Sequence, residues 1–342
     1  MTEFFVHLAV AALVAGAVTS VSVPLLVRFA SLAASVTRRE VRRDLRQEVE
    51  REIPRLGGVA VALGVGTACA LSFVMRWDRW VDVVPRDELL ALALGTALVF
   101  LLGLADDLVG VTPGQKLLVQ LLAAWLVVAV GWSFASLRLP VVGLVELGPW
   151  GPLLSLLWIV GVTNAMNLID GLDGLAGGIA AIVAASLLAY SLVQGNQGTS
   201  ILFAGVFGAS VGFLRHNWEP ARIFLGDSGS LTLGFLFGAM TAHSSIKAPA
   251  AVAILVPILA LGLPVIDTLL VMTLRFVEGS GRPLAGRVAR VMRADRNHLH
   301  HLLEHAVRRR SRLVVALYAV VGLFCAGALA VALGGGLTLG VS

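Results

Sequence analysis

Acidic side chains stand at the ends of apolar runs in this 342-residue sequence, and their chemistry suits a hard cation. Asp106 and Asp107 close one apolar run in LGLADDLVG, and Asp227 follows another in RIFLGDSGS. Adjacent carboxylates repel unless a cation lies near them. Magnesium prefers oxygen ligands and commonly takes one or two carboxylates together with substrate phosphates. These acids therefore indicate a divalent cation and a phosphate-bearing substrate, with a plain helix end at the water interface as the alternative for each.

A second group of polar residues ends the apolar part of TNAMNLIDGLDGLAGG. Asp170 and Asp173 are three residues apart, so a helical turn would project both from one face. Asn164 and Asn167 repeat that spacing one turn earlier. Polar side chains in such a place are costly unless something occupies them. An N-cap role explains Asp173 alone, so the stripe predicts a ligand-binding surface.

The sequence IFLGDSGSLTLG predicts a tight turn that opens directly into an apolar helix. Backbone N–H groups at a helix start bind phosphate readily, and Asp227 would there hold the metal that bridges it. A simple helix cap by Asp227 or Ser228 is the alternative. Phe224, just before the turn, would either stack on a base or anchor the chain at the membrane interface.

Three histidines gather in ADRNHLHHLLEH, namely His298, His300 and His301. No cysteine is near, so we favour imidazoles that donate hydrogen bonds to phosphate or sugar over zinc ligands. Arg296 beside them strengthens the prediction of an anion site. Asp267, inside LPVIDTLL, is a buried acid whose role stays open.

The elements that must position these residues are membrane helices. Hydrophobic residues make up 58% of the chain and charged residues 14%, whereas soluble domains have roughly half and one quarter. This balance excludes a water-facing globule and predicts an all-α polytopic membrane protein, a single domain over 1–342. Cys69 and Cys325 both lie in apolar runs, which excludes a secreted disulfide framework.

About ten apolar stretches approach the length that a helix needs to cross a bilayer, about 20 residues. Between two of them, Leu139–Leu147 is too short to span and predicts a small extended hairpin, and Thr37–Arg55 alternates acids with bases and predicts a solvated helix. The ten stretches are Phe4–Phe29, Leu56–Val74, Leu89–Leu104, Leu117–Phe134, Trp150–Met166, Leu175–Leu192, Ser200–Leu214, Leu231–Ala242, Ala250–Phe276 and Leu313–Leu333.

Lysine and arginine predict the orientation, because short cytoplasmic loops retain positive charge. With these spans, 21 of the 26 basic residues fall on one side. Both termini are then outside, and five cytoplasmic loops form the active site. The aspartates and histidines of the motifs also fall on this predicted cytoplasmic side, although only lysine and arginine were used to assign it. Because the basic residues flank membrane spans, a nucleic-acid partner is excluded, and attraction to anionic membrane lipid is a secondary reading.

At this point the motifs resemble a known family. REIPRLGG, LGLADDLVG, NAMNLIDGLDGLAGG, FLGDSGSLTLG and DRNHLHHLL are similar, in order and topology, to those of the polyprenyl-phosphate N-acetylhexosamine-1-phosphate transferases. NHLHH, interrupted by Leu299, resembles the branch that uses UDP-N-acetylglucosamine (UDP-GlcNAc) more than the peptidoglycan translocase.

The resemblance implies an activity on the cytoplasmic face of the bacterial inner membrane. A HexNAc-1-phosphate, foremost GlcNAc-1-phosphate, would pass from a UDP-N-acetylhexosamine to undecaprenyl phosphate, with release of UMP. The reaction would start cell-envelope polysaccharide or teichoic acid synthesis. The resemblance also implies Mg²⁺ as the cofactor, with Mn²⁺ as a substitute, and a homodimer.

Carried over by motif, the resemblance puts Asp106, Asp107 and His298 at the catalytic centre, with Asp227 and Asp107 as metal ligands. Asp106 is not obliged to act as a base, because a phosphate monoester is largely dianionic at neutral pH. Lys116 either contacts phosphate or snorkels at a helix end. The predicted substrate-binding residues are Lys116, Asn164, Asn167, Asp170, Asp173, Phe224, Arg296, His300 and His301.

Three alternatives stay open. Within the family, the donor could be the phospho-MurNAc-pentapeptide nucleotide. A CDP-alcohol phosphotransferase would need an arginine soon after the first Asp-Gly, and none follows Asp170. An ion-coupled transporter would need acids along an intramembrane path, whereas here only Asp267 is expected to lie deep.

Overall fold

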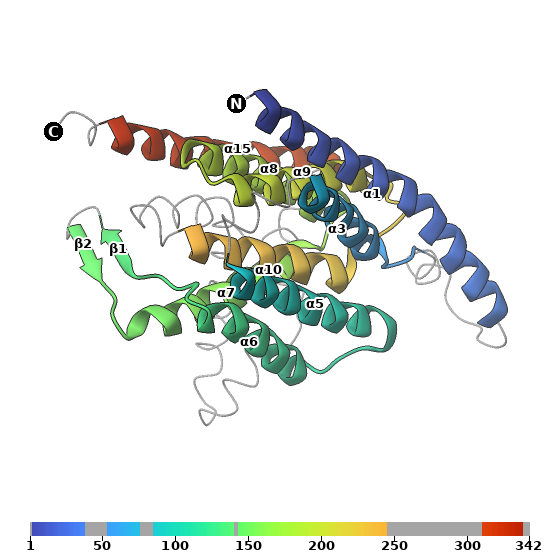
Figure 1. Cartoon of the computed structure of the whole chain (residues 1–342). Helices are drawn as coiled ribbons and strands as arrows, with labels where there is room; N and C mark the ends of the chain where they lie inside the picture. The colour runs from blue at the N-terminus through green and yellow to red at the C-terminus, as the bar shows by residue number, and fades with distance from the viewer. Residues whose placement is uncertain (1, 38–52, 76–84, 140–142, 245–309, 338–342) are drawn as a thin grey trace.

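The computed structural model describes residues 2–37, 53–75, 85–139, 143–244 and 310–337, which are nearly all helical (Figure 1). One two-stranded sheet, β1 and β2, accompanies the helices. The elements are α1 (Thr2–Thr37), α3 (Gly57–Met75), α5 (Arg86–Val109), α6 (Pro113–Ala129), β1 (Ser136–Leu139), β2 (Gly143–Glu146), α7 (Trp150–Ile169), α8 (Leu175–Val193), α9 (Gln197–Asn217), α10 (Gly226–Ser244) and α15 (Arg310–Leu337).

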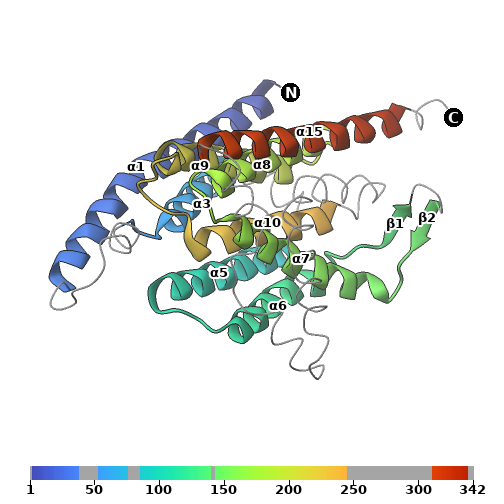
Figure 2. The same cartoon turned by 180° about the vertical axis from the view of Figure 1, so that it is seen from behind.

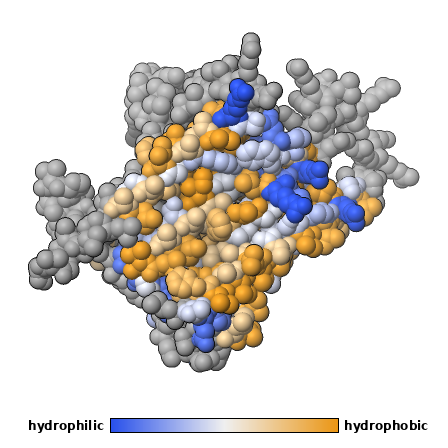
Figure 3. All heavy atoms as spheres, turned by 90° about the horizontal axis from the view of Figure 1, so that it is seen from above, coloured by the Kyte–Doolittle hydropathy of each residue, from blue (hydrophilic) through white to orange (hydrophobic). Residues whose placement is uncertain are grey.

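Seven of these helices are long and apolar enough to cross a bilayer, which confirms the prediction of an all-α polytopic membrane protein. Large apolar side chains remain exposed along them, such as Leu13 (72%), Leu101 (58%) and Leu323 (73%). Seen from above in Figure 3, apolar residues cover much of the face. Lipid rather than water is the solvent that suits such a surface.

Nine of the ten predicted apolar stretches fall in the described part of the chain, and each coincides with a helix. Ala250–Phe276 and most of Thr37–Arg55 lie outside the described residues. The bounds of Leu117–Phe134 are wrong: α6 begins at Pro113, where Thr112 and Gln115 form a capping box, and ends at Ala129. Gly131, with φ +100°, then turns the chain out of the helix.

The predicted hairpin around Leu139–Leu147 is confirmed as β1 and β2, which pair antiparallel with Ser136 opposite Glu146. Figure 1 shows the hairpin at one end of the bundle and the α5–α6 connection at the other. The acids that close α5 are therefore separated from the hairpin by the length of the helices.

Helix α10 lies in the middle of the bundle, as Figures 1 and 2 show from opposite sides, and packs against α3, α5 and α7. Almost every one of its described side chains is buried. Since protein rather than lipid surrounds it, α10 tolerates the glycines and hydroxyls of GDSGSLTLG. The first turn of this enclosed helix carries Asp227.

Helix α1 packs on α9 and α3, and α8 packs between α9 and α15. Glycines permit the closest of these contacts. A Cβ placed on Gly208 of α9 would stand 1.9 Å from the Ala12 carbonyl oxygen of α1. Small residues bring membrane helices close in this way.

Candidate active site

Four helix ends meet at the end of the bundle opposite the hairpin, and each brings at least one ionisable side chain. Asp106 lies in the last turn of α5, and Lys116 lies in the first turn of α6. Asp170 is the C-cap residue that directly follows α7, and Asp227 is in the first turn of α10. The prediction that the acids of separate motifs lie on one side of the membrane protein therefore agrees with the structure.

Lys116 joins two of these carboxylates. Its Nζ lies 2.7 Å from Asp106 Oδ2 and 2.6 Å from Asp227 Oδ2. The Val111 N–H donates to the other oxygen of Asp106 at 2.7 Å. The three charged side chains are each about one fifth exposed, with 23% for Lys116, 19% for Asp106 and 22% for Asp227. Lys116 therefore does not snorkel toward water, and its predicted contact with phosphate remains a prediction.

Asp107 holds the beginning of α10. Its Oδ1 accepts the Asp227 N–H at 2.8 Å, and its Oδ2 accepts the Ser228 N–H at 2.9 Å. A carboxylate satisfies the free amides of a helix start and interacts favourably with the helix dipole. These two amides were expected to bind phosphate, but Asp107 already occupies them. Both metal binding and catalysis by Asp107 stay predictions, and the structure adds a positioning contact to them.

Glycine is required beside this cap. Gly226 has φ +74°, a backbone region that L side chains rarely adopt. A Cβ there would also stand 2.7 Å from Asp107 Oδ2. On the other side of the cap, a Cβ on Gly103 of α5 would stand 2.4 Å from the Asp227 carbonyl oxygen. The GDSG turn is thus fitted closely against the end of α5.

Asp170 lies next to this group and feels its charge. Burial raises the pKa of the Asp170 carboxyl to about 7, and the negative charges of Asp227 and Asp107 add to the rise. The Gly226 N–H and the Arg55 guanidinium oppose it in part. A cation placed among these acids would favour the ionised form of Asp170.

The predicted stripe of four polar residues on one helical face is wrong. Helix α7 ends at Ile169, so Asp170 and Asp173 lie in a turn. Asp173 Oδ2 accepts the Ala221 N–H at 3.0 Å, and Gly174 rather than Asp173 is the N-cap of α8. Asp173 therefore ties the α7–α8 turn to the segment before the GDSG motif.

The two asparagines of α7 bind neighbouring helices. Asn164 and Gln120 of α6 exchange side-chain hydrogen bonds at 2.6 and 3.4 Å. Asn167 Nδ2 donates to Ser230 Oγ of α10 at 3.0 Å. Both asparagines fix α7 against the helices that carry Lys116 and Asp227. Their predicted contacts with substrate are not tested by these bonds.

The segment that leads into α3 lies along the segment that leads into α10. Phe224 N–H donates to the Pro54 carbonyl at 2.9 Å, and the Gly57 and Gly58 N–H groups donate to the Phe224 and Leu225 carbonyls at 2.9 and 2.7 Å. The IPRLGG part of the first motif thus fixes the backbone of Phe224. The Phe224 side chain stays partly exposed, as stacking on a base would require.

Sequence reasoning missed the residues that support the site through hydrogen bonds. Asn217 is buried, accepts the Gly174 N–H at 2.9 Å and donates to the Ile223 carbonyl at 2.8 Å. The Tyr318 hydroxyl of α15 donates to the Gly174 carbonyl. Gln120 pairs with Asn164 as described. A polar residue inside an apolar run was a usable signal for Gln120 and Tyr318, although it does not name their partners. Asn217 stands among polar residues in RHNWEP, so the sequence held no such signal for it.

Five predicted residues lie outside the described residues: Arg296, His298, His300, His301 and Asp267. Their roles therefore remain predictions from the sequence: catalysis for His298, and substrate contacts for Arg296, His300 and His301. The role of Asp267 stays open.

The donor set suits magnesium. One cationic nitrogen already lies within 2.7 Å of oxygens from Asp106 and Asp227, and these ligands, among the residues that the structure describes, are hard oxygens rather than sulfur or imidazole. Within the described ranges, no three acidic, histidine or cysteine side chains form a ready-made metal cage. Magnesium is compatible with such a site, because it usually keeps several waters and binds substrate phosphates.

The chain is similar to a known protein family and to several known bacterial proteins. A family model described as glycosyl transferase family 4 matches residues 89–245, which run from the first turn of α5 to the end of α10. A probable undecaprenyl-phosphate N-acetylglucosaminyl 1-phosphate transferase of Bacillus subtilis is 29% identical over 252 residues, which cover 73% of this chain and 65% of that protein. The match thus spans just under two thirds of the B. subtilis protein.

Two further relatives extend the comparison. A decaprenyl-phosphate N-acetylglucosaminephosphotransferase of Mycolicibacterium smegmatis is 32% identical over 298 residues, which cover 80% of this chain and 71% of that protein. A phospho-N-acetylmuramoyl-pentapeptide-transferase of Chlamydia trachomatis is 33% identical over 210 residues, with 54% and 59% covered.

Proposed function

The chain belongs to glycosyl transferase family 4, and from this membership we propose that it transfers GlcNAc-1-phosphate from UDP-GlcNAc to undecaprenyl phosphate. Two of the relatives compared are named as GlcNAc phosphotransferases that act on a polyprenyl phosphate. The single observation that carries the proposal is the meeting of Asp106, Lys116, Asp170 and Asp227 at one end of a membrane-spanning bundle.

The location of the site supports this reaction. A polyprenyl acceptor is anchored in the bilayer while a sugar nucleotide is soluble, so their phosphates can meet only at the membrane surface. The bias of lysine and arginine supports the cytoplasmic face of the bacterial inner membrane. The product would be the first lipid-linked sugar of a cell-envelope polysaccharide or teichoic acid.

In the proposed reaction, an oxygen of the lipid phosphate attacks the β-phosphorus of UDP-GlcNAc. The new P–O bond forms as the bond from that phosphorus to the oxygen bridging to the α-phosphate breaks, and UMP leaves. The attacking phosphate is largely dianionic at neutral pH, so no side chain has to remove a proton first. The role of the protein is to bring two anions together and to offset their repulsion.

Residues of this chain supply that offset. Asp227 and Asp106 would hold Mg²⁺, which when bound would neutralise charge on the diphosphate. Asp107 keeps Asp227 in place through the start of α10, and Lys116 brings a positive charge to the same point. Phe224, whose side chain is partly exposed just before the GDSG turn, would stack on uracil. Mn²⁺ is expected to substitute for Mg²⁺, since both accept oxygen ligands.

Purified protein in detergent, given radiolabelled UDP-GlcNAc, undecaprenyl phosphate and Mg²⁺, should form lipid-linked sugar and an equal amount of UMP. UDP-N-acetylgalactosamine and UDP-MurNAc-pentapeptide are tested side by side, because the chlamydial relative makes the second a real alternative. If no donor gives a lipid-linked product, the proposal is wrong. A CDP-alcohol donor, run in parallel, tests the remaining enzymatic alternative.

The variant Asp227→Asn tests the metal site in the same assay. It should lower Mg²⁺-dependent turnover by about a hundredfold or more, because the metal loses a charged ligand while metal-ion stabilisation is worth several kcal/mol. The fold should survive, since Lys116 still pairs with Asp106. Equal thermal unfolding midpoints would establish this, and undiminished turnover would remove Asp227 from the metal site.

A further inference from the structure

Lys116 occupies the point between two carboxylates at which a divalent cation would bind. Its Nζ contacts Asp106 Oδ2 at 2.7 Å and Asp227 Oδ2 at 2.6 Å. We propose that Lys116 is an internal counter-cation, which holds these carboxylates together in the metal-free protein and is displaced when a divalent cation binds. The inference rests on the proposed function in one respect, that Asp106 and Asp227 bind the metal.

Other contacts hold both acids, Asp106 through its carboxylate and Asp227 through its backbone, so the two residues stay close together when Lys116 leaves. The second oxygen of Asp106 accepts the Val111 N–H at 2.7 Å. Asp227 is held through its backbone, because its N–H donates to Asp107 and the adjoining turn is bonded to the segment before α3. Without any cation, the two negative charges would repel each other.

Lys116 is the movable member of the group. It sits on a four-carbon flexible stem, and its side chain is 23% exposed. Ion pairs between groups that water still reaches are weakened by solvent screening, so a competing cation can break them. Mg²⁺ approaches oxygen ligands to about 2.0–2.1 Å, so it and the ammonium cannot share one position between the same oxygens.

Displacement has a consequence for the reaction. A Lys116 ammonium that leaves the carboxylates remains charged and stays beside the metal. It is then free to meet the phosphate that the metal binds. The protein would thus exchange an internal ion pair for a metal and a phosphate contact in one step, and Lys116 would engage phosphate only in the metal-loaded state.

The first test uses Mg²⁺ alone, without nucleotide or lipid, on the full-length protein in detergent. Thermal unfolding midpoints are recorded along a Mg²⁺ titration. Lys116→Met should bind Mg²⁺ about tenfold more tightly than the wild type, which is about 1.4 kcal/mol. Arg222→Met is the control. Arg222 is exposed near the same end of the bundle, and its substitution removes one positive charge that contacts neither carboxylate. Equal Mg²⁺ affinities in the two variants would overturn the proposal.

A second variant checks that the effect passes through the carboxylates. Lys116→Met should lower the unfolding midpoint in the absence of Mg²⁺, because Asp106 and Asp227 then repel. Adding Asp227→Asn to it should restore the midpoint and abolish the Mg²⁺ response. If the double variant still shows the tightened Mg²⁺ binding, Lys116 does not act through Asp227 and the proposal is wrong.

The third measurement needs no substitution at Lys116. The chain has two lysines, Lys116 and Lys247, so a small amine-acylating reagent followed by peptide mass spectrometry reads each separately. Mg²⁺ should raise acylation of Lys116 severalfold relative to Lys247 in the same wild-type sample, because the ammonium leaves its ion pairs. An unchanged ratio would overturn the displacement.

The outcomes separate this inference from the proposed function. The displacement alone would be refuted if the wild type makes lipid-linked sugar with Mg²⁺, Mg²⁺ does not raise acylation of its Lys116, and Lys116→Met does not bind Mg²⁺ more tightly. Displacement by Mg²⁺ in a protein that uses no sugar nucleotide would refute the proposed function alone.

Discussion

Each acid at the site has a different set of neighbours, and those neighbours give chemically similar carboxylates different tasks. Asp106 and Asp227 face one ammonium, whereas Asp107 faces two backbone amides. Asp170 faces the other acids and has a pKa of about 7. Adjacent residues such as Asp106 and Asp107 therefore cannot be assigned one shared role.

Removal of the Asp107 carboxylate should loosen the start of α10. Asp107→Ala leaves the Asp227 and Ser228 N–H groups without their acceptor, so we expect a loss of about 1–2 kcal/mol in the free energy of unfolding. Turnover should also fall, because Asp227 moves. Asp107→Asn keeps one acceptor oxygen and should lie between wild type and Asp107→Ala. If Asp107→Asn weakens Mg²⁺ binding without loss of stability, Asp107 acts as a ligand rather than through the helix start.

Asp170 should make the stability of the metal-free protein depend on pH. Its folded pKa of about 7 lies above the unfolded value, so the folded protein holds a proton that the unfolded chain has released. The stability of the wild type should therefore fall as the pH rises from about 4 to about 7, by at most about 1.4 kcal/mol per pH unit.

Unfolding midpoints of wild type and Asp170→Asn, recorded against pH in a chelating buffer, check this expectation. Asp170→Asn should lack this component, so the difference between the two proteins should change steadily over that pH range. Parallel curves would contradict the raised pKa.

At the scale of elements, the site depends on helix ends held together by buried polar bonds. Asn217 joins three of them, since it receives the Gly174 N–H at the start of α8, ends α9 and donates to the Ile223 carbonyl before α10. Asn164 and Gln120 do the same for α7 and α6. Bonds between helices therefore decide where Asp227 and Lys116 lie, and among these three residues only Asn164 is also a predicted substrate contact.

Asn217→Ala should destabilise the protein by about 1–3 kcal/mol, because it leaves a buried donor and a buried acceptor unpaired. Asn217→Asp keeps an acceptor for the Gly174 N–H, but it loses the donor to Ile223 and buries a negative charge beside that carbonyl. At neutral pH, unfolding midpoints in detergent should therefore be lower in both variants than in the wild type, and no higher in Asn217→Asp than in Asn217→Ala. Equal midpoints in all three would show that water replaces these bonds.

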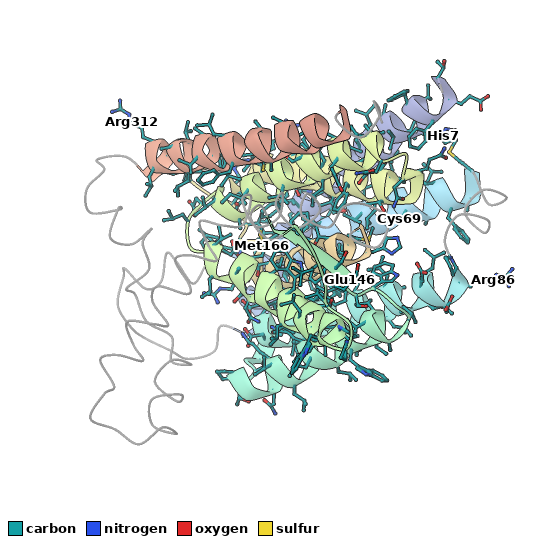
Figure 4. All side chains as sticks on the ribbon, turned by 90° about the vertical axis from the view of Figure 1, so that its left-hand side faces the viewer. His7, Cys69, Arg86, Glu146, Met166 and Arg312 are labelled. Carbon is teal, nitrogen blue, oxygen red and sulfur yellow. The ribbon has the colours of Figure 1, made fainter. Side chains whose placement is uncertain are left out.

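At the scale of the whole molecule, the site and the hairpin lie at opposite ends of a membrane-spanning bundle. Glu146 on β2 is exposed, and Figure 4, drawn from the hairpin's end of the bundle, labels it. Arg222, just before the GDSG turn, is exposed at the other end. The two ends should therefore face different compartments.

Cysteine labelling in intact cells tests the predicted orientation. In a protein whose Cys69 and Cys325 are replaced by alanine, a membrane-impermeant thiol reagent should label Glu146→Cys from outside. Arg222→Cys should be labelled only after the inner membrane is opened. The reverse pattern would put the site outside, where no sugar nucleotide is expected, and would contradict the predicted topology.

Sequence alone determined the class of protein and the end of the bundle at which its chemistry lies. The length and apolar content of each run are local properties, and they sufficed to predict nine helices and the hairpin among the described residues. The distribution of arginine among the loops predicted which helix ends lie on the same side. Local pattern was weaker where a helix stops: α6 ends early at Ala129, and α7 stops before Asp170.

Only the tertiary structure decided which groups touch. Lys116 and Asp227 are 111 residues apart, Asp107 and Asp227 are 120 apart, and Gln120 and Asn164 are 44 apart. Hydropathy specifies that such helices cross the bilayer, but it does not specify how each is rotated about its axis or which neighbour it packs against. Those choices depend on close packing at small residues and on pairing buried polar groups, and both are properties of two segments at once.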